Sequence, residues 1–137
     1  MKIQELMIGD WVVSNEHPEE YLKIYDIELY QNSVSCERIN GLSRFPSPVD
    51  LNGILITEKF LIDNGFKKVV STYDITNVNY LLTWCENYYV QMQQVREDNW
   101  LINIHGDYAN INGGVGYVHE LQHMLAVAGI KQEIIMQ

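Results

Sequence analysis

The clearest hydrophobic pattern in the chain lies near its C-terminus, between Tyr117 and Gly129. At about 100° per residue, the apolar side chains of this stretch gather on one stripe of a helix: Tyr117, Val118, Leu121, Met124, Leu125 and Ala128. His119 and His123 fall on the opposite side, where we expect them to face solvent. Gly129 favours the left-handed conformation that ends a helix. The pattern predicts an amphipathic helix packed against a sheet.

Residues 1–50 alternate short apolar runs with turn residues, a pattern typical of short strands. We expect strands at residues 11–13, 21–29, 34–36 and 42–45. The apolar positions change phase between Ile24 and Ile27, which predicts a β-bulge. Asn40 and Gly41 both tolerate the positive φ of a type I′ turn and predict a short hairpin. Turns spaced this closely indicate a small, strongly bent, barrel-like sheet.

Residues 51–137 mix helical and strand patterns. After a turn at Asn52-Gly53, Thr57 is suited to cap a two-turn helix that ends at Gly65. Alternating segments, with turns at Glu86-Asn87 and at residues 97–99, predict an antiparallel meander on which the C-terminal helix packs. Its strands are expected at residues 66–73, 79–85, 88–93 and 100–104, with a last edge strand at residues 133–136. The chain is therefore predicted to be a single α+β domain, residues 1–137, with sub-lobes at 1–50 and 51–137.

The segment between Gly106 and Gly116 is rich in Gly and Asn, and we expect it to be a flexible connector. A glycine-rich turn at the start of a helix can also cradle a phosphate with backbone N–H groups. No Lys-Ser or Lys-Thr pair follows it, so the segment is not a P-loop. The meander before it is rich in Tyr and Trp, which could stack on sugars or bases. Packing between neighbouring strands is the favoured interpretation of these rings.

The amino-acid composition and net charge of the chain make some kinds of binding partner less favourable than others. The chain is 47% hydrophobic and 20% charged, with a formal net charge of -9. This charge disfavours binding to nucleic acid or to anionic membranes, since both are polyanions. The sequence has neither the apolar core of a signal peptide nor the run of about 18 apolar residues typical of a membrane helix. We interpret Cys36 and Cys85 as buried thiols in a reducing compartment, and therefore expect a cytoplasmic protein.

The C-terminal helix contains a His-Glu-x-x-His motif, which is the spacing of zinc metalloproteases. On a helix, His119 and His123 would share a face and could both coordinate zinc, while Glu120 could act as general base on a metal-bound water. Catalytic zinc needs a third protein ligand, and the positions downstream of the motif do not offer one. His105 and Asp107 are the nearest upstream candidates. The zinc site is therefore the minor interpretation of the motif.

Three stretches, spread over the whole chain, resemble a family of small proteins encoded by gut bacteria and their phages. Residues 5–12, ELMIGDWV, resemble the family's opening ELRIGNWV. Residues 56–66, ITEKFLIDNGF, are similar to its LTEEWLLKFGF segment, and residues 117–122, YVHELQ, to its closing helix, YVHQLQNLYFALTGEEL. Where this chain has Glu120 and His123, the family pattern reads Gln and Asn, which could not support zinc hydrolysis. The resemblance implies a type of protein and no activity.

These observations lead to two hypotheses of function. The leading one is a small non-enzymatic accessory protein, phage- or mobile-element-like, that acts by binding another protein or by self-association. It requires no cofactor. The alternative is a zinc-dependent metallohydrolase in which His119 and His123 bind the metal and Glu120 is catalytic. The two hypotheses differ in whether the protein holds stoichiometric zinc.

Overall fold

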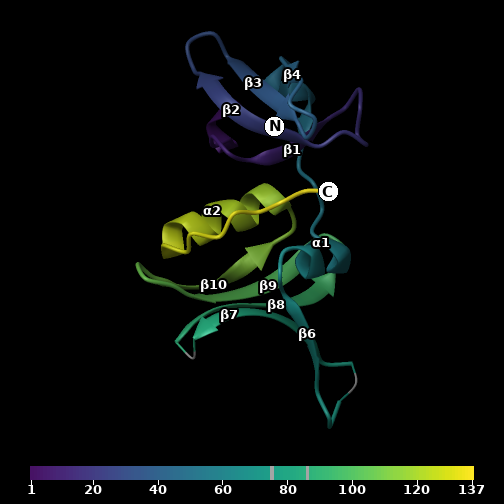
Figure 1. Cartoon of the computed structure of the whole chain (residues 1–137), viewed down its shortest axis with the longest axis vertical. Helices are drawn as coiled ribbons and strands as arrows, with labels where there is room; N and C mark the ends of the chain where they lie inside the picture. Colours follow the sequence, from purple (N-terminus) through teal and green to yellow (C-terminus); the bar gives the residue numbers. More distant parts are fainter. Residues whose placement is uncertain (75, 86) are drawn as a thin grey trace. The chain divides into compact units, whose positions relative to one another are not determined.

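The structure is a computed structural model that describes residues 1–74, 76–85 and 87–137. The chain forms two compact units, Met1–Ile54 with Met136–Gln137, and Leu55–Ile135 (Figure 1). Each unit is built on its own antiparallel sheet of five strands, and the longest helix lies near the C-terminus. The fold is mostly β, compatible with the predicted α+β class. Within the described ranges, no helix has the length and apolar character needed to cross a membrane.

The first unit contains one sheet and two short 3-10 helices. In sequence order its elements are η1 (Ile3–Glu5), β1 (Trp11–Ser14), β2 (Leu22–Glu28), β3 (Ser33–Arg38), β4 (Ser43–Arg44), η2 (Pro48–Asp50) and β5 (Leu51–Asn52). The strand order is β4-β3-β2-β1-β5. The core is formed by Ile3 and Leu6 at η1 together with buried strand residues: Val12, Leu22, Ile24, Val34, Cys36 and Leu51. The predicted bulge is confirmed, because the β2–β3 register shifts between Ile24 and Asp26.

Two turn predictions in this unit are wrong. Asn40-Gly41 does not form a type I′ turn, because only Gly41 has a positive φ, of 86°. Arg38 N–H donates to Leu42 C=O at 2.8 Å and Gly41 N–H donates to Arg38 C=O at 2.9 Å, so the hairpin closes with a three-residue loop. Asn52 does not turn the chain either. It belongs to β5, which pairs with β1, since the sheet supplies partners for its backbone.

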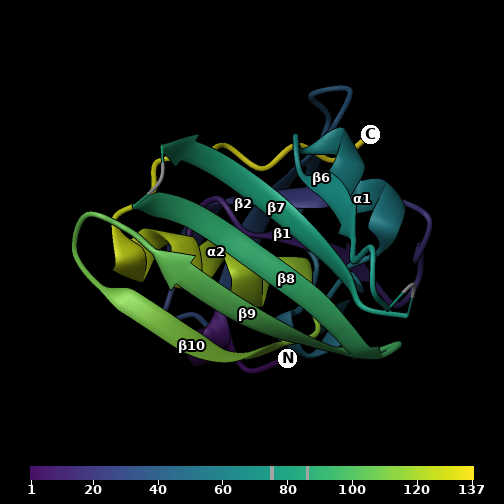
Figure 2. The same ribbon diagram turned by 90° about the horizontal axis from the view of Figure 1, so that it is seen from below.

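The second unit wraps a curled sheet around a helix (Figure 2). Its elements are α1 (Glu58–Asp63), β6 (Lys67–Val70), β7 (Val78–Cys85), β8 (Tyr88–Arg96), β9 (Asn99–His105), β10 (Asn110–Val115) and α2 (Val118–Ala128). The strand order β10-β9-β8-β7-β6 follows the chain without a crossover, as expected for a meander. Part of the predicted turn at Glu86-Asn87 lies outside the described residues.

Local capping explains where α1 begins and ends. The hydroxyl of Thr57 accepts a hydrogen bond from Phe60 N–H at 3.1 Å, as predicted for an N-cap. Phe60 and Leu61 are the buried residues of the helix. Gly65 follows with a φ of 90°, a conformation that favours glycine, and the chain turns directly into β6. The short helix is therefore determined largely by local sequence.

The apolar stripe of α2 packs on the sheet much as its spacing predicts. Val118, Leu121, Leu125 and Ala128 are all buried, and Gly129 ends the helix with a φ of 78°. The prediction is wrong for Tyr117, which is exposed at the N-cap position. Below the helix, the fully buried Trp100 donates its indole N–H to Ile56 C=O at 3.2 Å and packs edge-on against Tyr80.

Two further predictions are wrong in the C-terminal half. The glycine-rich segment is not a loop, because residues 110–115 form β10 and pair with β9 in unbroken register. Gly113 suits this strand because a Cβ there would lie only 3.1 Å from the terminal methyl of Met124. Residues 133–136 form no strand. Ile134 and Met136 are buried, and Ile135 between them bonds to a side chain instead of a sheet.

Candidate functional site

Glu120, the residue expected to be the base of a zinc site, caps α2 instead. Its Oε1 accepts hydrogen bonds from the N–H groups of Gly116 and Tyr117, both at 3.0 Å. These are backbone donors at the helix N-terminus, where a carboxylate also interacts favourably with the helix dipole. The carboxylate is therefore held toward the backbone of residues 116–117, and its role in this structure is to fix the start of the helix.

The two histidines of the motif do lie together, as their spacing predicts. The ring centroids of His119 and His123 are 5.7 Å apart at an interplanar angle of 75°. His119 also stacks on Tyr117, with centroids 5.9 Å apart. The expectation that both histidines face solvent is wrong, because His119 is only 8% exposed and His123 is half-buried. The buried imidazole ring of His119 therefore packs among the side chains at the start of α2.

The third ligand that catalytic zinc requires is not supplied by the expected residues. His105 stacks instead on Tyr89, with centroids 4.6 Å apart and the planes within 15° of parallel. Among the residues that the structure describes, no three His, Cys, Asp or Glu side chains gather as a metal site would require. With Glu120 engaged as a cap, the donor set does not fit the hydrolytic zinc centre of the alternative hypothesis.

The most unusual surface of the molecule is the side of the second sheet that faces away from α2. Alternate residues of each strand point to this side, because their neighbours Tyr80, Met92 and Ile102 are buried against the helix. We call it the amide face. It comprises Lys67, Val69, Asn79, Leu81, Thr83, Tyr89, Gln91, Gln93, Leu101, Asn103, His105, Asn110, Asn112 and Gly114. It contains no carboxylate, although the chain has 18 Asp and Glu residues.

Strand register brings the amides of this face together. Leu81, Gln91, Asn103 and Asn112 are successive cross-strand partners from β7 to β10. Gln91 donates to Asn79 Oδ1 at 3.1 Å, so part of the row is already ordered by internal hydrogen bonds. Each carboxamide offers donors and acceptors without charge. The carboxamides of Gln91, Asn103 and Asn112 can therefore hydrogen-bond to a neutral polar partner across three strands.

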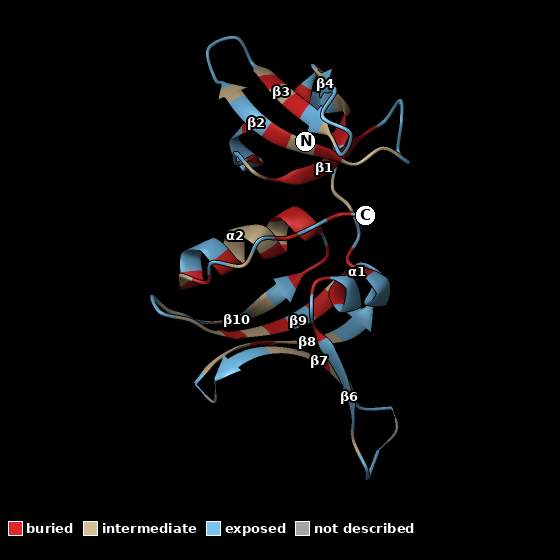
Figure 3. Ribbon diagram, viewed as in Figure 1, coloured by how far each residue is buried: buried red, intermediate tan, exposed pale blue. Residues whose placement is uncertain are grey.

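The amide face is hollowed in two places that share Asn79 and Gln91. One hollow, of about 490 Å³, has Gln91, Asn103 and Asn112 among the residues that line it. The other, of about 390 Å³, lies toward β6 and is bounded by Leu81, Thr83 and Tyr89. Side chains here are half-buried or exposed, whereas the strands carry buried residues toward α2 (Figure 3). The aromatic platform considered from the sequence is limited on this face to Tyr89, stacked on His105.

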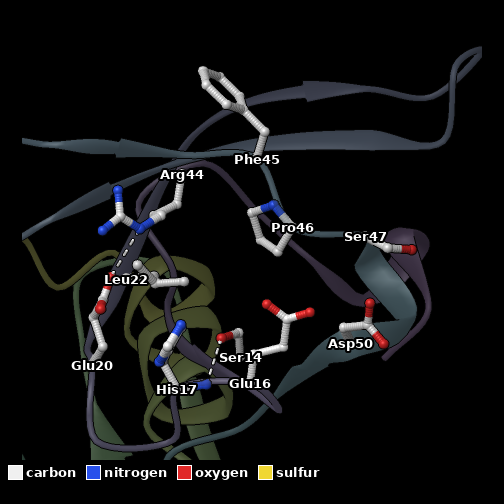
Figure 4. A pocket seen from close by; sticks show the side chains of 10 residues that line it. All are labelled: Ser14, Glu16, His17, Glu20, Leu22, Arg44, Phe45, Pro46, Ser47 and Asp50. Atoms are coloured by element: carbon white, nitrogen blue, oxygen red, sulfur yellow. Dashed lines mark hydrogen bonds and ion pairs between the residues drawn. The ribbon is translucent and has the colours of Figure 1, made fainter.

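A separate hollow of about 280 Å³ lies in the first unit and is lined mainly by polar side chains, together with Leu22, Phe45 and Pro46 (Figure 4). Glu20 Oε1 lies 2.8 Å from Arg38 Nε and 3.4 Å from Arg44 Nε, so two guanidinium groups share one carboxylate. His17 N–H donates to the hydroxyl of Ser14 at 3.2 Å. These contacts tie the loop after β1 to the sheet, and engage Glu20 in ion pairs rather than acid–base chemistry.

The two cysteines have different environments. Cys36 is fully buried in β3, and burial raises the pKa of its thiol from 9.0 to about 11. Such a thiol is a poor nucleophile, since the thiolate is the reactive form. Cys85 is exposed at the end of β7, so the expectation that both thiols are buried is wrong for this residue.

The amide face was missed in the sequence because its residues are individually unremarkable. The signal lies in which side of each strand they occupy: Asn79, Gln91, Gln93, Asn103, Asn110 and Asn112 all stand at positions that point to the same side of the sheet. Only the register of the strand pairs shows that these positions form one surface. Comparisons of the chain with models of protein families, with curated proteins and with solved structures found no match.

Proposed function

We propose that this chain is a small, cytoplasmic, non-enzymatic accessory protein of the phage or mobile-element type, and that it acts by binding another protein. The observation that carries the proposal is the amide face, a broad surface without carboxylates on a protein of net charge -9. The resemblance of residues 5–12, 56–66 and 117–122 to small phage and gut-bacterial proteins supports the type.

The chemistry of the amide face suits a protein partner. The centres of protein interfaces are depleted in charged residues and contain aromatic side chains and neutral hydrogen-bonding groups. Gln91 and Asn103 provide the neutral groups at the middle of the face, with Tyr89 and Leu101 beside them. A nucleic acid would need cations to neutralise its phosphates, and this face offers only Lys67 and His105.

The zinc hydrolase is the weaker proposal. It would need Glu120 to leave its two backbone donors at the start of α2 and a third ligand to approach His119 and His123. The described residues favour a packing and capping role for the motif. The amide face needs no such rearrangement, because its groups already point outward.

The proposal is tested by placing charge at the centre of the face without changing its shape. The double variant Gln91→Glu, Asn103→Asp adds two carboxylates, and the control Gln31→Glu, Asn40→Asp adds the same charge on the first unit. Each protein is used to capture partners from the cells that produce it, with quantification by mass spectrometry. We expect a partner bound by wild type and control to fall by about tenfold or more with the face variant. Equal recovery by all three proteins would refute the proposal.

A further inference from the structure

The strand β10 forms one edge of the second sheet and is unusually regular (Figure 2). All six of its residues pair with β9 without a register shift, whereas the β7–β8 and β8–β9 pairs are both irregular. Edge strands expose backbone groups to which another strand can pair, and proteins usually protect them with Lys, Pro or a bulge. The edge strand β6 carries Lys67 and Lys68, but β10 has no such protection.

The hairpin before β10 determines which of its backbone groups point outward. Gly106 N–H donates to Ala109 C=O at 3.1 Å, so these residues form a hydrogen-bonded pair. In an antiparallel ladder, such pairs alternate with pairs whose N–H and C=O groups point away from each other. Ile111, Gly113 and Val115 therefore bond to β9. Asn110, Asn112 and Gly114 direct their N–H and C=O groups away from the sheet.

The end of this edge already accepts a strand from within the unit. Gly116 follows the same alternation and directs its C=O outward, where it accepts a hydrogen bond from Ile56 N–H at 3.0 Å. Leu55 forms an antiparallel bridge with Tyr117 beside it. The pairing stops there because the chain enters α1. Among the described residues, no other backbone segment continues it along Gly114, Asn112 and Asn110.

Of the two glycines in β10, Gly114 is the one that leaves this edge accessible. A glycine within a strand often marks a place where another backbone approaches closely. At Gly113, glycine is explained by packing, because a side chain there would point toward α2 and crowd Met124. Gly114 lies on the exposed side, where a Cβ would be 3.2 Å from Asn99 Oδ1. Asn110, Asn112 and Gly114 are all exposed, so the outward groups are accessible to a partner strand.

The charges at the two ends of β10 distinguish between occupants. Asp107 lies in the hairpin loop at one end. At the other end, Gly116 packs against the backbone carbonyl of Asp98, and Glu97 precedes it. Arg96 is next to these two carboxylates, and the three side chains together still have a negative formal charge. Two copies of this chain paired through β10 must run antiparallel by symmetry, which would bring acidic ends together. A strand with basic ends is complementary instead.

We infer that β10 is the docking edge for an extended segment of the partner protein, which adds as a sixth strand and carries Lys or Arg at both ends. The inference rests on the proposed protein-binding function and specifies where the partner's backbone binds. Main-chain hydrogen bonds to Asn110, Asn112 and Gly114 supply the pairing. Alternate side chains of the incoming strand extend the amide face beside Asn110 and Asn112.

The test uses two synthetic peptides with the same alternating Thr-Val core, one with Lys at both ends and one with Glu. Binding is measured by titration, and amide hydrogen exchange is followed by NMR. We expect the Lys-ended peptide to slow exchange at Asn112 and Gly114, and to bind about tenfold more tightly than the Glu-ended peptide at low salt. Protection of β6 instead, equal affinity for the two peptides, or no binding of the Lys-ended peptide at millimolar concentration would overturn the inference.

Variants at one position separate the backbone from the side chain. Asn112→Pro removes an outward N–H while leaving the bonds to β9, and Asn112→Ala removes only the side chain. We expect the proline variant to weaken binding of the Lys-ended peptide by about tenfold and the alanine variant by less than about twofold. Val70→Pro on β6, the other edge strand of the sheet, is the control, and it should bind the Lys-ended peptide as tightly as wild type. If the protein alone forms a dimer, and Asn112→Pro converts it to a monomer, the partner strand at β10 is a second copy of this chain, which would overturn the inference. The two proposals can fail separately. If the Lys-ended peptide binds at β10 as expected but the Gln91→Glu, Asn103→Asp variant still captures every partner, β10 is a docking edge and the amide face is not the protein-binding surface.

Discussion

The side chain of Asn64 and the backbone of Ile135 hydrogen-bond to each other in both directions. Asn64 Nδ2 donates to Ile135 C=O at 3.0 Å, and Ile135 N–H donates to Asn64 Oδ1 at 2.8 Å. The same Nδ2 also donates to Phe60 C=O at 3.0 Å. A buried carboxamide therefore gives the C-terminal tail the backbone partners that a neighbouring strand would otherwise provide.

Replacing Asn64 should destabilise the second unit. Asn64→Ala leaves the N–H and C=O of Ile135 without these partners, and we expect a loss of about 1–3 kcal/mol in the free energy of unfolding. Asn64→Asp keeps the acceptor but loses both donated bonds, and should also destabilise. Urea denaturation measures the change, with Asn87→Ala on an exposed turn as the control. Stability of Asn64→Ala equal to that of the control would contradict this account of the tail.

Glu120 should contribute to stability through its cap. Glu120→Ala removes the acceptor for two backbone N–H groups at the start of α2, with an expected cost of about 0.5–2 kcal/mol. Glu120→Gln retains an acceptor oxygen and should lose less. Thermal and urea unfolding of the two variants measure this order. A catalytic base with no structural role would leave both unfolding curves unchanged, which is the outcome that contradicts the capping role.

Zinc should not stabilise this protein. We expect protein purified without a histidine tag to contain far less than one equivalent of zinc, and its melting temperature to be unaffected by zinc or by a chelator. Elemental analysis and thermal unfolding provide the measurements, with His123→Ala as the control. One equivalent of zinc that disappears in His123→Ala would restore the metallohydrolase hypothesis.

The two cysteines should differ sharply in reactivity. At pH 8, we expect a thiol reagent to modify Cys85 rapidly and Cys36 only when the protein unfolds, since burial raises the pKa of Cys36 to about 11. Cys85→Ser should abolish the fast phase. Rapid labelling of native Cys85→Ser would show that the burial of Cys36 does not protect it.

The same raised pKa affects stability in alkali. The unfolded thiol ionises near its ordinary pKa of 9.0, whereas the folded thiol holds its proton until about pH 11. The stabilisation is therefore complete below pH 9 and is lost as pH rises from 9 to 11. Cys36→Ala removes this contribution, so its stability should decline less steeply over that range.

Elements determined by neighbouring residues were predictable from the sequence. The cap at Thr57, the left-handed glycines at positions 65 and 129, and the phase change after Ile24 all describe local backbone conformation, and each is found where predicted. The buried stripe of α2 also follows from helical spacing alone. The hairpin at Asn40-Gly41 is present, but the predicted type I′ turn is wrong, because a three-residue loop satisfies the same glycine preference with one positive φ.

Features that depend on distant contacts were not predictable. Gly113 and Gly114 indicate a loop by composition, yet pairing with β9 and packing under Met124 make them part of a strand. The burial of His119 likewise depends on surroundings that helical phase does not report. The amide face needs the register of two successive strand pairs, β8–β9 and β9–β10, before Asn103 can be placed beside Gln91 and Asn112.

The length of the loop between Gly106 and Ala109 determines the register of β10 against β9, and with it the side of the sheet to which each β10 side chain points. Because facing and hydrogen bonding both alternate with a period of two, adding a single residue to this loop would invert β10. Asn110 and Asn112 would then point toward α2, and their N–H groups toward β9. Loop length thus selects which surface the protein presents. A homologue that differs by one residue here would keep the sheet but offer a different edge.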